Sequence, residues 1–514
     1  MTTEPPDIRE ASFVDSVKQD IEEFAKEFVG SQFTTFKSNK IINDAVWGTQ
    51  RFEKHELSII SLPIIQRLRQ IRQMGFVNYV YPSAIHTRFE HTLGTTILAG
   101  KLFTYAKKES EKFLDENDLI HIRIAALLHD IGHCMFSHTS EEVYGHLLSK
   151  MIDDDLPNAD PKPHEYFAYL LINTEAFRKF FSFLSLTYRM TVDHKRIANY
   201  IIGATDSEAE RYKVSFVNGA FDADKLDYIY RDSKFSGIPL MLDLDRLMHE
   251  IAISDYSEIE EDTIVKDMTI GLSGVSSLEQ IVFNKMLLFS TIYHHQKVKA
   301  CDCMFKGIFE YLYENKKCLN FRKRQLYFNK PTDFLWFTDT EFMSAALQTE
   351  DEEIHRMIHN ILYRRPLKRA LVISRKTIEE DGDLMALMAT KANRAERDQS
   401  RRELSRKIWE DAGRPCSKHD IWVDIPMPPS FKESDTTYVR TDRTNPNTGL
   451  RALTDFFPTT QWTDQYNTHK LKGHVFAPDD CLDIIAISAK KILEKELKIS
   501  FKTEAFRFCK VQQQ

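Results

Sequence analysis

Apolar residues recur with helical spacing along most of this chain, and that period constrains the fold more than any other feature. Residues 15–29 place Val17, Ile21 and Phe24 on one face, so the spacing predicts an amphipathic helix. The same period returns over residues 64–75, 90–109, 122–133, 163–181 and 278–316. Strand signals are few, and the better ones cover residues 76–82, 370–374 and 437–441. We therefore expect a mainly α-helical protein.

The length of 514 residues exceeds the size at which one hydrophobic core keeps growing, so we expect a large domain with appended lobes. We assign residues 1–40 to an N-terminal helical extension, 41–310 to a helical core and 311–514 to a smaller, mixed α/β C-terminal lobe. That lobe contains the strongly charged segment 385–412, which its composition predicts to be a solvated helix.

Composition and charge exclude several classes of protein. Apolar residues make up 42% and charged residues 28% of the chain, which is typical of a globular protein. The net charge of −7 argues against a protein whose main task is non-specific nucleic-acid binding. No stretch approaches the ~20 apolar residues of a membrane span, and the first residues lack the apolar core of a secretory signal. Because seven irregularly spaced cysteines also fit reduced thiols, we expect a cytoplasmic protein without a membrane partner.

Three short blocks bring histidine and carboxylate side chains together. They cover residues 86–91, which open a predicted helix, residues 128–141 and residues 222–232. Imidazole and carboxylate ligands together suit a borderline or hard divalent metal ion. Such an ion lowers the pKa of bound water and neutralises phosphate charge. The blocks therefore indicate a metal-dependent enzyme that acts on phosphate compounds.

The spacing suggests how these side chains meet. The adjacent His129 and Asp130, at a helix end, can put a nitrogen and an oxygen on one ion. His91 and Asp224, from neighbouring helices, could complete a four-ligand set with open positions for water and phosphate. A single His-Asp pair in a chain with 18 histidines is expected by chance, so the order of the blocks carries the interpretation.

Two further spacings concern the residues that follow the His-Asp pair. His129 and His133 are four residues apart and would share a helix face. His138 and Glu141 are three apart, which suits a carboxylate that orients a neighbouring imidazole for proton transfer. The second block therefore predicts a general acid or base beside the metal ligands.

The three blocks resemble the HD-domain deoxynucleoside triphosphate triphosphohydrolases, a family that includes bacterial dGTPases and the vertebrate dNTPase with a sterile-alpha-motif domain. The matching motifs are R-F-E-H-T-L-G, then L-L-H-D-I-G-H with F-S-H, then D-A-D-K-L-D-Y with R-D. The resemblance runs from about Ile41 to about Met304, and weakly through residues 361–370. It implies a helical HD core and a reaction that releases intact triphosphate and a deoxynucleoside.

The resemblance also implies roles for individual residues. The positions of the family's metal ligands correspond to His91, His129, Asp130 and Asp224. The positions of its catalytic groups correspond to His138, Glu141 and His164, with His133 near the α-phosphate. Six further residues correspond to substrate contacts: Gln73, Arg88, Lys225, Tyr228, Asp232 and Lys285. The cofactor implied is a divalent metal ion, with manganese, iron, zinc and magnesium all open.

Tyr228 predicts how the sugar would be selected. A tyrosine ring packed against C2′ excludes a 2′-hydroxyl, while Gln73 and Asp232 can hydrogen-bond the 3′-hydroxyl. Tyr228 lies four residues after Asp224 and three after Lys225, so on a helix these side chains could line one wall of a cleft. We therefore expect deoxynucleotides to be preferred over ribonucleotides.

The activator site of the vertebrate enzymes is matched less well. Nucleotide-contacting positions there correspond to Asn43, Gln66, Arg69 and Arg246. However, Ser61 stands where that family has a guanine-reading aspartate, and N-D-A-V-W-G departs from the usual N-D-P-x-H-G. We therefore do not predict activation by guanine nucleotides, and whether a nucleotide activator is needed stays open. The family also implies a homo-oligomer, a tetramer or a hexamer.

Two alternatives remain at this level. One is another HD phosphohydrolase, acting on nucleoside monophosphates, cyclic nucleotides or guanosine tetraphosphate. The other is a non-catalytic nucleotide sensor or nucleic-acid-binding module. Tyr228 and its motif favour a deoxynucleoside triphosphatase over the first, and the intact metal-ligand set and the net charge argue against the second. Antiviral defence and balancing of the nucleotide pool would use the same chemistry.

Overall fold

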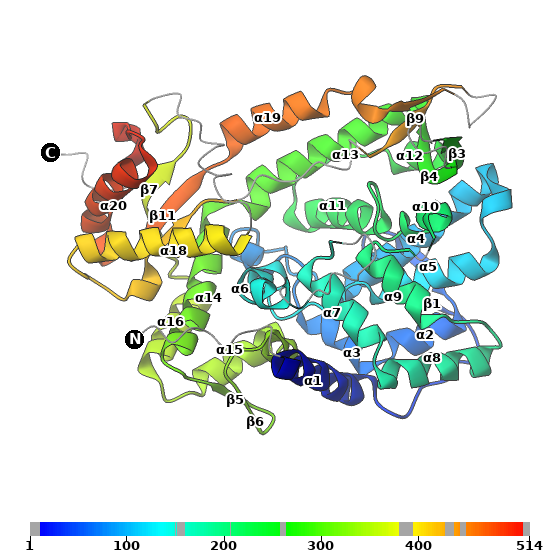
Figure 1. Cartoon of the computed structure of the whole chain (residues 1–514), viewed down its shortest axis with the longest axis horizontal. Helices are drawn as coiled ribbons and strands as arrows, with labels where there is room; N and C mark the ends of the chain where they lie inside the picture. Colours follow the sequence, from blue (N-terminus) through cyan, green and yellow to red (C-terminus); the bar gives the residue numbers. More distant parts are fainter. Residues whose placement is uncertain are drawn as a thin grey trace.

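The computed structural model describes residues 11–149, 151, 160–205, 207–257, 264–379, 394–426, 436–442 and 449–506. Within these residues the protein is mainly helical with several small sheets, which confirms the predicted fold class (Figure 1). Buried apolar side chains form two clusters. The larger runs through the helices up to residue 367 and also takes in Trp422, Val439, Leu453, Phe457 and Phe476, and the smaller lies in the C-terminal part of the chain.

The helices of the larger cluster are α1 (Ala11–Val29), α2 (Lys54–Ile60), α3 (Pro63–Arg67), α4 (Arg88–Glu109), α5 (Glu116–Leu128), α6 (His138–Ser149), α7 (Pro163–Ile172), α8 (Glu175–Tyr188), α9 (His194–Ile202), α10 (Arg211–Val214), α11 (Ala223–Ser236), α12 (Leu244–His249), α13 (Val275–Leu288), α14 (Gln296–Glu314), α15 (Asp339–Leu347) and α16 (Glu352–Leu362). The later helices are α18 (Arg394–Asp411), α19 (Thr459–Lys470) and α20 (Leu482–Leu497).

The strands among the described residues form four small sheets. Antiparallel hairpins join β1 (Lys40–Asp44) to β2 (Gly48–Phe52) and β5 (Leu319–Phe321) to β6 (Arg324–Leu326). A four-stranded sheet has the order β10 (Leu450–Ala452), β9 (Tyr438–Arg440), β4 (Ile264–Gly271) and β3 (Ile251–Ser257), with β4 and β9 parallel. A three-stranded antiparallel sheet has the order β7 (Lys368–Ile373), β11 (Gly473–Ala477) and β8 (Trp422–Asp424).

Helix α4, which carries the first of the three sequence blocks, packs against α5 and α11. It begins with a capping box, in which the Thr87 backbone N–H donates to Glu90 at 2.8 Å and so satisfies an otherwise orphaned group. Helix α5 ends at Leu128, so the His-Asp pair follows directly at a helix end, as the sequence predicts. These three helices therefore bring the three sequence blocks to one place.

The predicted strand at residues 76–82 is wrong. The chain there forms a 3-10 turn, η2 (Gly75–Tyr79), which begins at a glycine with φ +50°. Phe76 is fully buried because its ring stacks on Phe136, with centroids 4.5 Å apart. The apolar residues of this segment are therefore explained by the packing of a compact turn. They do not alternate between two faces as in a strand.

The predicted helix over residues 64–75 is shorter in the structure. Helix α3 stops at Arg67 and continues only as a 3-10 turn, η1 (Leu68–Gln70). Beyond it the chain pairs with the segment before α4, because the Gln73 N–H donates to the His86 carbonyl and the Arg88 N–H to the Ile71 carbonyl. This pairing replaces the last helical turns.

Two long predicted helices are interrupted. Residues 163–181 form α7 and α8, separated where Thr174 caps α8 by accepting a hydrogen bond from the Phe177 N–H. Residues 278–316 form α13, a π-helical turn η6 (Phe289–Tyr293) and α14, which His295 caps. The strands predicted at 370–374 and 437–441 are confirmed as β7 and β9, and the helix at 15–29 as α1.

The smaller apolar cluster combines the sheet of β7, β8 and β11 with α18 and α20, which pack against each other. The charged helix predicted at 385–412 corresponds to α18 over residues 394–411, and residues 385–393 lie outside the described part of the chain. Residues 311–367 contribute to the larger cluster, and the domain boundary at residue 310 stays a prediction. None of the described helices has the length and apolar character that a membrane span requires.

Candidate active site

A cavity of about 880 Å³ opens among α6, α7, α11, α13 and α14. This volume falls in the range of small-molecule sites. All six predicted substrate contacts line it: Gln73, Arg88, Lys225, Tyr228, Asp232 and Lys285. Its wall also contains Asp130 and Asp224 of the predicted metal ligands, and His138 and His164 of the predicted catalytic groups. Residues from all three sequence blocks thus meet at one site.

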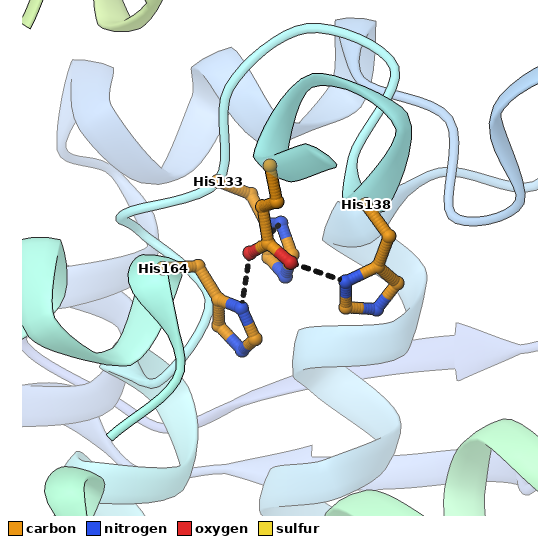
Figure 2. Close-up of side chains that lie close together, drawn as sticks. His133, His138 and His164 are labelled. Atoms are coloured by element: carbon orange, nitrogen blue, oxygen red, sulfur yellow. Dashed lines mark hydrogen bonds and ion pairs between the residues drawn. The ribbon is translucent and has the colours of Figure 1, made fainter. Parts of the chain in front are cut away.

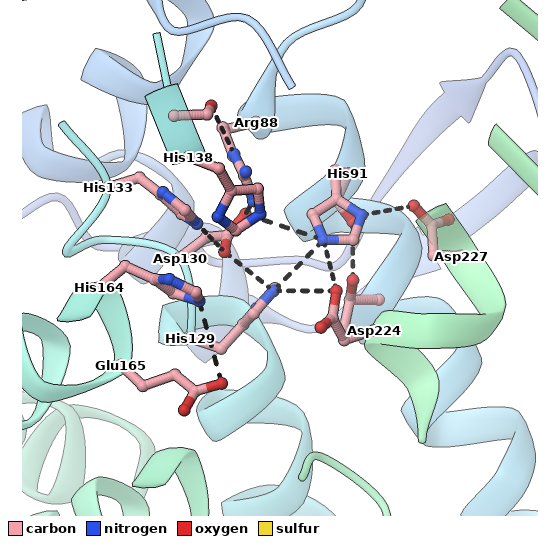
Figure 3. Close-up of polar contacts among 12 residues, drawn as sticks. Arg88, His91, His129, Asp130, His133, His138, His164, Glu165, Asp224 and Asp227 are labelled. Carbon is pink, nitrogen blue, oxygen red and sulfur yellow. Dashed lines mark hydrogen bonds and ion pairs between the residues drawn. The ribbon is translucent and has the colours of Figure 1, made fainter. Parts of the chain in front are cut away.

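The four predicted metal ligands lie together beside this cavity (Figure 3). His91 Nε2, from α4, lies 2.9 Å from Asp224 Oδ1, at the start of α11, and 3.3 Å from His129 Nε2. Asp130 places Oδ1 3.3 Å from His129 Nε2 and Oδ2 3.7 Å from His91 Nε2. His91, His129 and Asp224 therefore lie close enough together to hold one ion, and Asp130 approaches the same two imidazoles.

The protonation of the two imidazoles fits a metal ion. His129 Nδ1 lies 2.7 Å from the Ala126 carbonyl, which only accepts, so Nδ1 carries the proton and Nε2 presents a lone pair. His91 Nδ1 lies 2.8 Å from Asp227 Oδ2, which fixes the Nδ1 proton in the same way. A bound ion would then take the place of the proton at His91 Nε2, between the two imidazoles and the carboxylates.

The electrostatics of the group point the same way. Burial disfavours a charged His91, but the carboxylates of Asp224 and Asp227 outweigh burial and raise its pKa to about 10. Burial also opposes ionisation of Asp130, yet Arg88, His129 and His133 hold its pKa well below the usual value. The carboxylates thus favour a positive charge at this site, and a divalent ion would compete with protons for the same ligand atoms.

Sequence reasoning missed the groups that hold His91. Asp227 and Arg231 are both fully buried, and Arg231 Nε donates to Asp227 Oδ2 at 2.8 Å. Arg231 Nη2 also donates to Asp44 Oδ2, in β1, at 3.0 Å. The sequence did contain a signal for the contact between Asp227 and Arg231. These residues stand four apart inside the third block, which is the spacing of an ion pair on a helix.

A second group adjoins the first through His133, whose Nε2 lies 3.3 Å from Asp130 Oδ1, and the rings of His138 and His164 are in view in Figure 2. His138 Nδ1 lies 2.7 Å from Glu141 Oε2, and His164 Nδ1 lies 2.5 Å from Glu141 Oε1. Burial disfavours the charged form of both His164 and Glu141. Their attraction outweighs it, which raises the pKa of His164 and holds that of Glu141 well below its usual value.

His133 does not share a helix face with His129, which corrects the sequence prediction. Helix α5 ends before both residues, and the chain turns there, with positive φ at Phe136 and Ser137. The turn stacks the ring of His133 on that of His164, with centroids 3.9 Å apart and ring planes 18° apart. Burial, and secondarily Arg88, hold the pKa of His133 well below its usual value, so the ring is neutral.

The histidines of this second group and Glu141 are also close enough to hold an ion. However, the nearly parallel rings of His133 and His164 keep their in-plane lone pairs from converging on one point. Glu141 already accepts the Nδ1 protons of His138 and His164. The arrangement therefore favours proton transfer at the Nε2 atoms of His138 and His164 over metal binding.

The glycine of the second block is required by a close approach. A Cβ on Gly132 would lie 2.1 Å from the His164 carbonyl oxygen and 2.7 Å from the Ala168 nitrogen, both in α7. Gly132→Ala would therefore displace α7, and with it His164, and overpacking of this kind costs about 1–3 kcal/mol. Thermal unfolding should show the loss, and a Gly132→Ala protein as stable and active as the wild type would contradict it.

Several predicted substrate contacts are held by neighbours. Asp232 lies 2.8 Å from His86 Nε2 and accepts from the Tyr293 hydroxyl at 2.6 Å, two residues that sequence reasoning did not single out. Lys225 donates to Asp222 at 2.6 Å. These contacts fix the positions of groups that face the cavity.

Two of the predicted contacts leave buried polar atoms unsatisfied. Arg88 donates to Asp130 and Ser137, yet its Nη2 has no hydrogen-bond partner among the described residues. Gln73 Oε1 is also buried without a hydrogen-bond partner among the described residues. Because buried polar atoms are normally paired, an orphaned donor and an orphaned acceptor on a cavity wall point to a ligand that supplies the partners.

The four predicted activator residues lie outside the cavity lining and make local contacts. Gln66 donates to the Ile60 carbonyl at 2.7 Å, and Arg69 donates to Gln66 at 2.8 Å. Arg246 donates to the Ser273 carbonyl, and Asn43 accepts from Thr49. They belong to β1, to the turn at α3 and to α12, and their role stays a prediction (Figure 1).

Comparison with known proteins identifies the family. Residues 88–229 match the HD domain, and residues 242–504, more than half of the chain, match the HD associated region. The chain belongs to the HD-domain family. The three sequence blocks of this HD-domain protein fall in or next to the first match, which confirms the family that they resemble.

Similar proteins come from several lineages. This HD-domain protein is 26% identical over 69% of its length to the deoxynucleoside triphosphate triphosphohydrolase SAMHD1 homolog of Dictyostelium discoideum. It is 28% identical over 52% of its length to human deoxynucleoside triphosphate triphosphohydrolase SAMHD1, and 30% identical over 52% to protein MJ1154 of Methanocaldococcus jannaschii. The matches cover 65%, 44% and 48% of these relatives, so the chain spans about half to two thirds of their length.

Proposed function

We propose that this protein hydrolyses deoxynucleoside triphosphates to a deoxynucleoside and inorganic triphosphate in the cavity described above. The observation that carries the proposal is the order of side chains on α11. Asp224, Tyr228 and Asp232 all line the cavity and follow one another at four-residue intervals, about 6 Å apart along the helix axis. A metal ligand, a ring and a hydroxyl acceptor therefore lie in the order of phosphate, sugar face and 3′-hydroxyl. Two of the similar proteins, from Dictyostelium discoideum and human, are named deoxynucleoside triphosphate triphosphohydrolases, which supports the same reaction.

The metal ligands would be His91, His129, Asp130 and Asp224. A divalent ion bound there would lower the pKa of a coordinated water and neutralise phosphate charge. Arg88 supplies a guanidinium beside Asp130, and its orphaned Nη2 can donate to a phosphate oxygen. Lys225, beside Asp224 on α11, adds a second positive charge for the outer phosphates.

His164 and His138 are the proton donors in this proposal. The carboxylate of Glu141 stabilises the protonated form of His164 and fixes both rings through their Nδ1 atoms. Each ring thus presents Nε2 to the cavity, where it can give a proton to the leaving 5′-oxygen. His138 is the more exposed of the two, with 61% of its side chain accessible, whereas His164 is buried.

A panel assay tests the reaction. Purified protein is incubated with each deoxynucleoside triphosphate and with Mn²⁺, Mg²⁺ or Fe²⁺, and released triphosphate is separated from phosphate and pyrophosphate. Triphosphate with a matching amount of deoxynucleoside supports the proposal. Turnover of only monophosphates, cyclic nucleotides or guanosine tetraphosphate would assign another HD phosphohydrolase, and nucleotide binding without turnover would assign a sensor.

The same samples, with and without added nucleotides, would test the proposed homo-oligomer by sedimentation.

The sugar preference should depend on Tyr228. A ring against C2′ leaves no room for a 2′-hydroxyl, and apolar pockets reject an added hydroxyl by ~10²-fold. Tyr228→Ala should bring kcat/KM for matched deoxy- and ribonucleotides close together and lower the rate through looser positioning. Tyr228→Phe, which keeps the ring, should retain the preference. Equal wild-type activity on both sugars would contradict this role.

A further inference from the structure

The β1–β2 hairpin is connected to a proposed metal ligand through one indole ring. Trp47, in the turn between the strands, donates from Nε1 to Asp227 Oδ1 at 2.5 Å. The other oxygen of that carboxylate, Oδ2, lies 2.8 Å from His91 Nδ1. A residue 180 positions away from Asp227 in the sequence is therefore two hydrogen bonds from the proposed metal position.

The hairpin and the carboxylate are held in one closed network. Asp44 accepts from the backbone N–H groups of Val46 and Trp47 at 2.7 and 2.8 Å, which fixes the hairpin turn. Arg231 then joins Asp44 to Asp227, with Nη2 3.0 Å from an oxygen of each. The position of the indole and the position of the carboxylate thus depend on each other.

The space around Asp227 leaves it little freedom. Asp227 and Arg231 are fully buried, and a Cβ on Gly94 of α4 would lie 2.0 Å from Asp227 Oδ1. Trp47 itself is only half-buried, with its ring stacked on Tyr230 at 5.3 Å and Lys101 over the ring face at 5.5 Å. The indole is therefore the accessible end of a chain of contacts whose other members are enclosed.

We propose that Trp47 is a positioning residue for the metal site. By donating to Oδ1 it fixes the rotation of the Asp227 carboxylate, so that Oδ2 holds the Nδ1 proton of His91 and directs the Nε2 lone pair at the ion. Groups one step behind a ligand change metal affinity by about 10–100-fold when they are lost. The inference rests on the proposed metal site and is independent of the substrate.

Trp47→Phe tests it, because phenylalanine keeps an aromatic ring beside Tyr230 but has no N–H donor. Trp422→Phe is a matched control in the C-terminal part, where the indole donates to the His419 carbonyl at 2.7 Å. Each protein is titrated with Mn²⁺, followed by the loss of the free-ion EPR signal, and the unfolding temperature of the metal-free form is recorded. We expect the dissociation constant for Mn²⁺ to rise ~10–100-fold in Trp47→Phe alone, with comparable unfolding temperatures in both variants.

The possible outcomes are distinct. An unchanged Mn²⁺ affinity in Trp47→Phe, with tight binding by the wild type, overturns the positioning role and leaves the metal site standing. A wild type that binds no Mn²⁺, Fe²⁺ or Zn²⁺ overturns both. If Trp47→Phe does not fold, the benzothiophene analogue of tryptophan at position 47 keeps the ring shape without the N–H donor, and the same shift in affinity is expected. Co²⁺ absorption spectra that change only on loss of this donor would add support from ligand geometry.

Discussion

Asp130→Ala should lose both tight metal binding and turnover while keeping the fold. Asp130 supplies two oxygens to the converging group, one 3.3 Å from His129 Nε2 and one 3.7 Å from His91 Nε2. Because the ion would supply both charge neutralisation and an activated water, its loss should lower the rate by ~10³-fold or more. Metal content after dialysis and triphosphate release would be measured on the same sample.

The Asp130→Ala substitution also breaks a buried ion pair, so its effect on stability needs a control. Asp130 also pairs with buried Arg88 at 2.9 Å, and removal of one partner of a buried ion pair costs about 3–5 kcal/mol. Asp420, which is buried and lies 2.7 Å from the half-exposed Arg356 of α16, offers the loss of a buried, paired carboxylate away from the cavity. We expect Asp420→Ala to lose stability but to keep its metal and its turnover. Full activity of metal-depleted Asp130→Ala would refute the metal mechanism.

The sequence predicted which side chains come together better than it predicted the backbone that presents them. His91, Asp130 and Asp224 belong to short motifs whose order is informative, and each lies at or near a helix end, where local spacing is a reliable guide. The placement of His133 could not be predicted in this way. Its stacking on His164 depends on a turn after α5 and on α7, which Gly132 allows to approach.

Contacts between distant parts of the chain were the least accessible to sequence reasoning. The link from Trp47 to Asp227 joins a hairpin to a helix across 180 positions, and no local period encodes it. The pairing of β4 with β9 is similar, because a parallel partner lies far along the chain. Such contacts are specified by side-chain complementarity in the folded state, and helical periodicity reports only the burial of one face.

Glu141→Gln should slow the reaction and change its pH dependence. Glu141 accepts from both His138 and His164, but a glutamine side chain has a single acceptor oxygen, so one ring loses its partner. Loss of an oriented general acid lowers the rate by ~10²–10⁴-fold. The carboxylate is also what raises the pKa of His164 against the effect of burial.

The sign of the pH effect follows from that shift. A general acid acts while it is protonated, so the rate falls as pH rises through the pKa of His164, and the carboxylate moves that fall to higher pH. Glu141→Gln should therefore shift the descending limb of the kcat profile to lower pH. Glu56→Gln removes another buried carboxylate, paired with Arg123 between α2 and α5, and should leave the limb in place. A Glu141→Gln enzyme with a lower rate but an unmoved limb would show that Glu141 supports the fold of the site and not the proton donor.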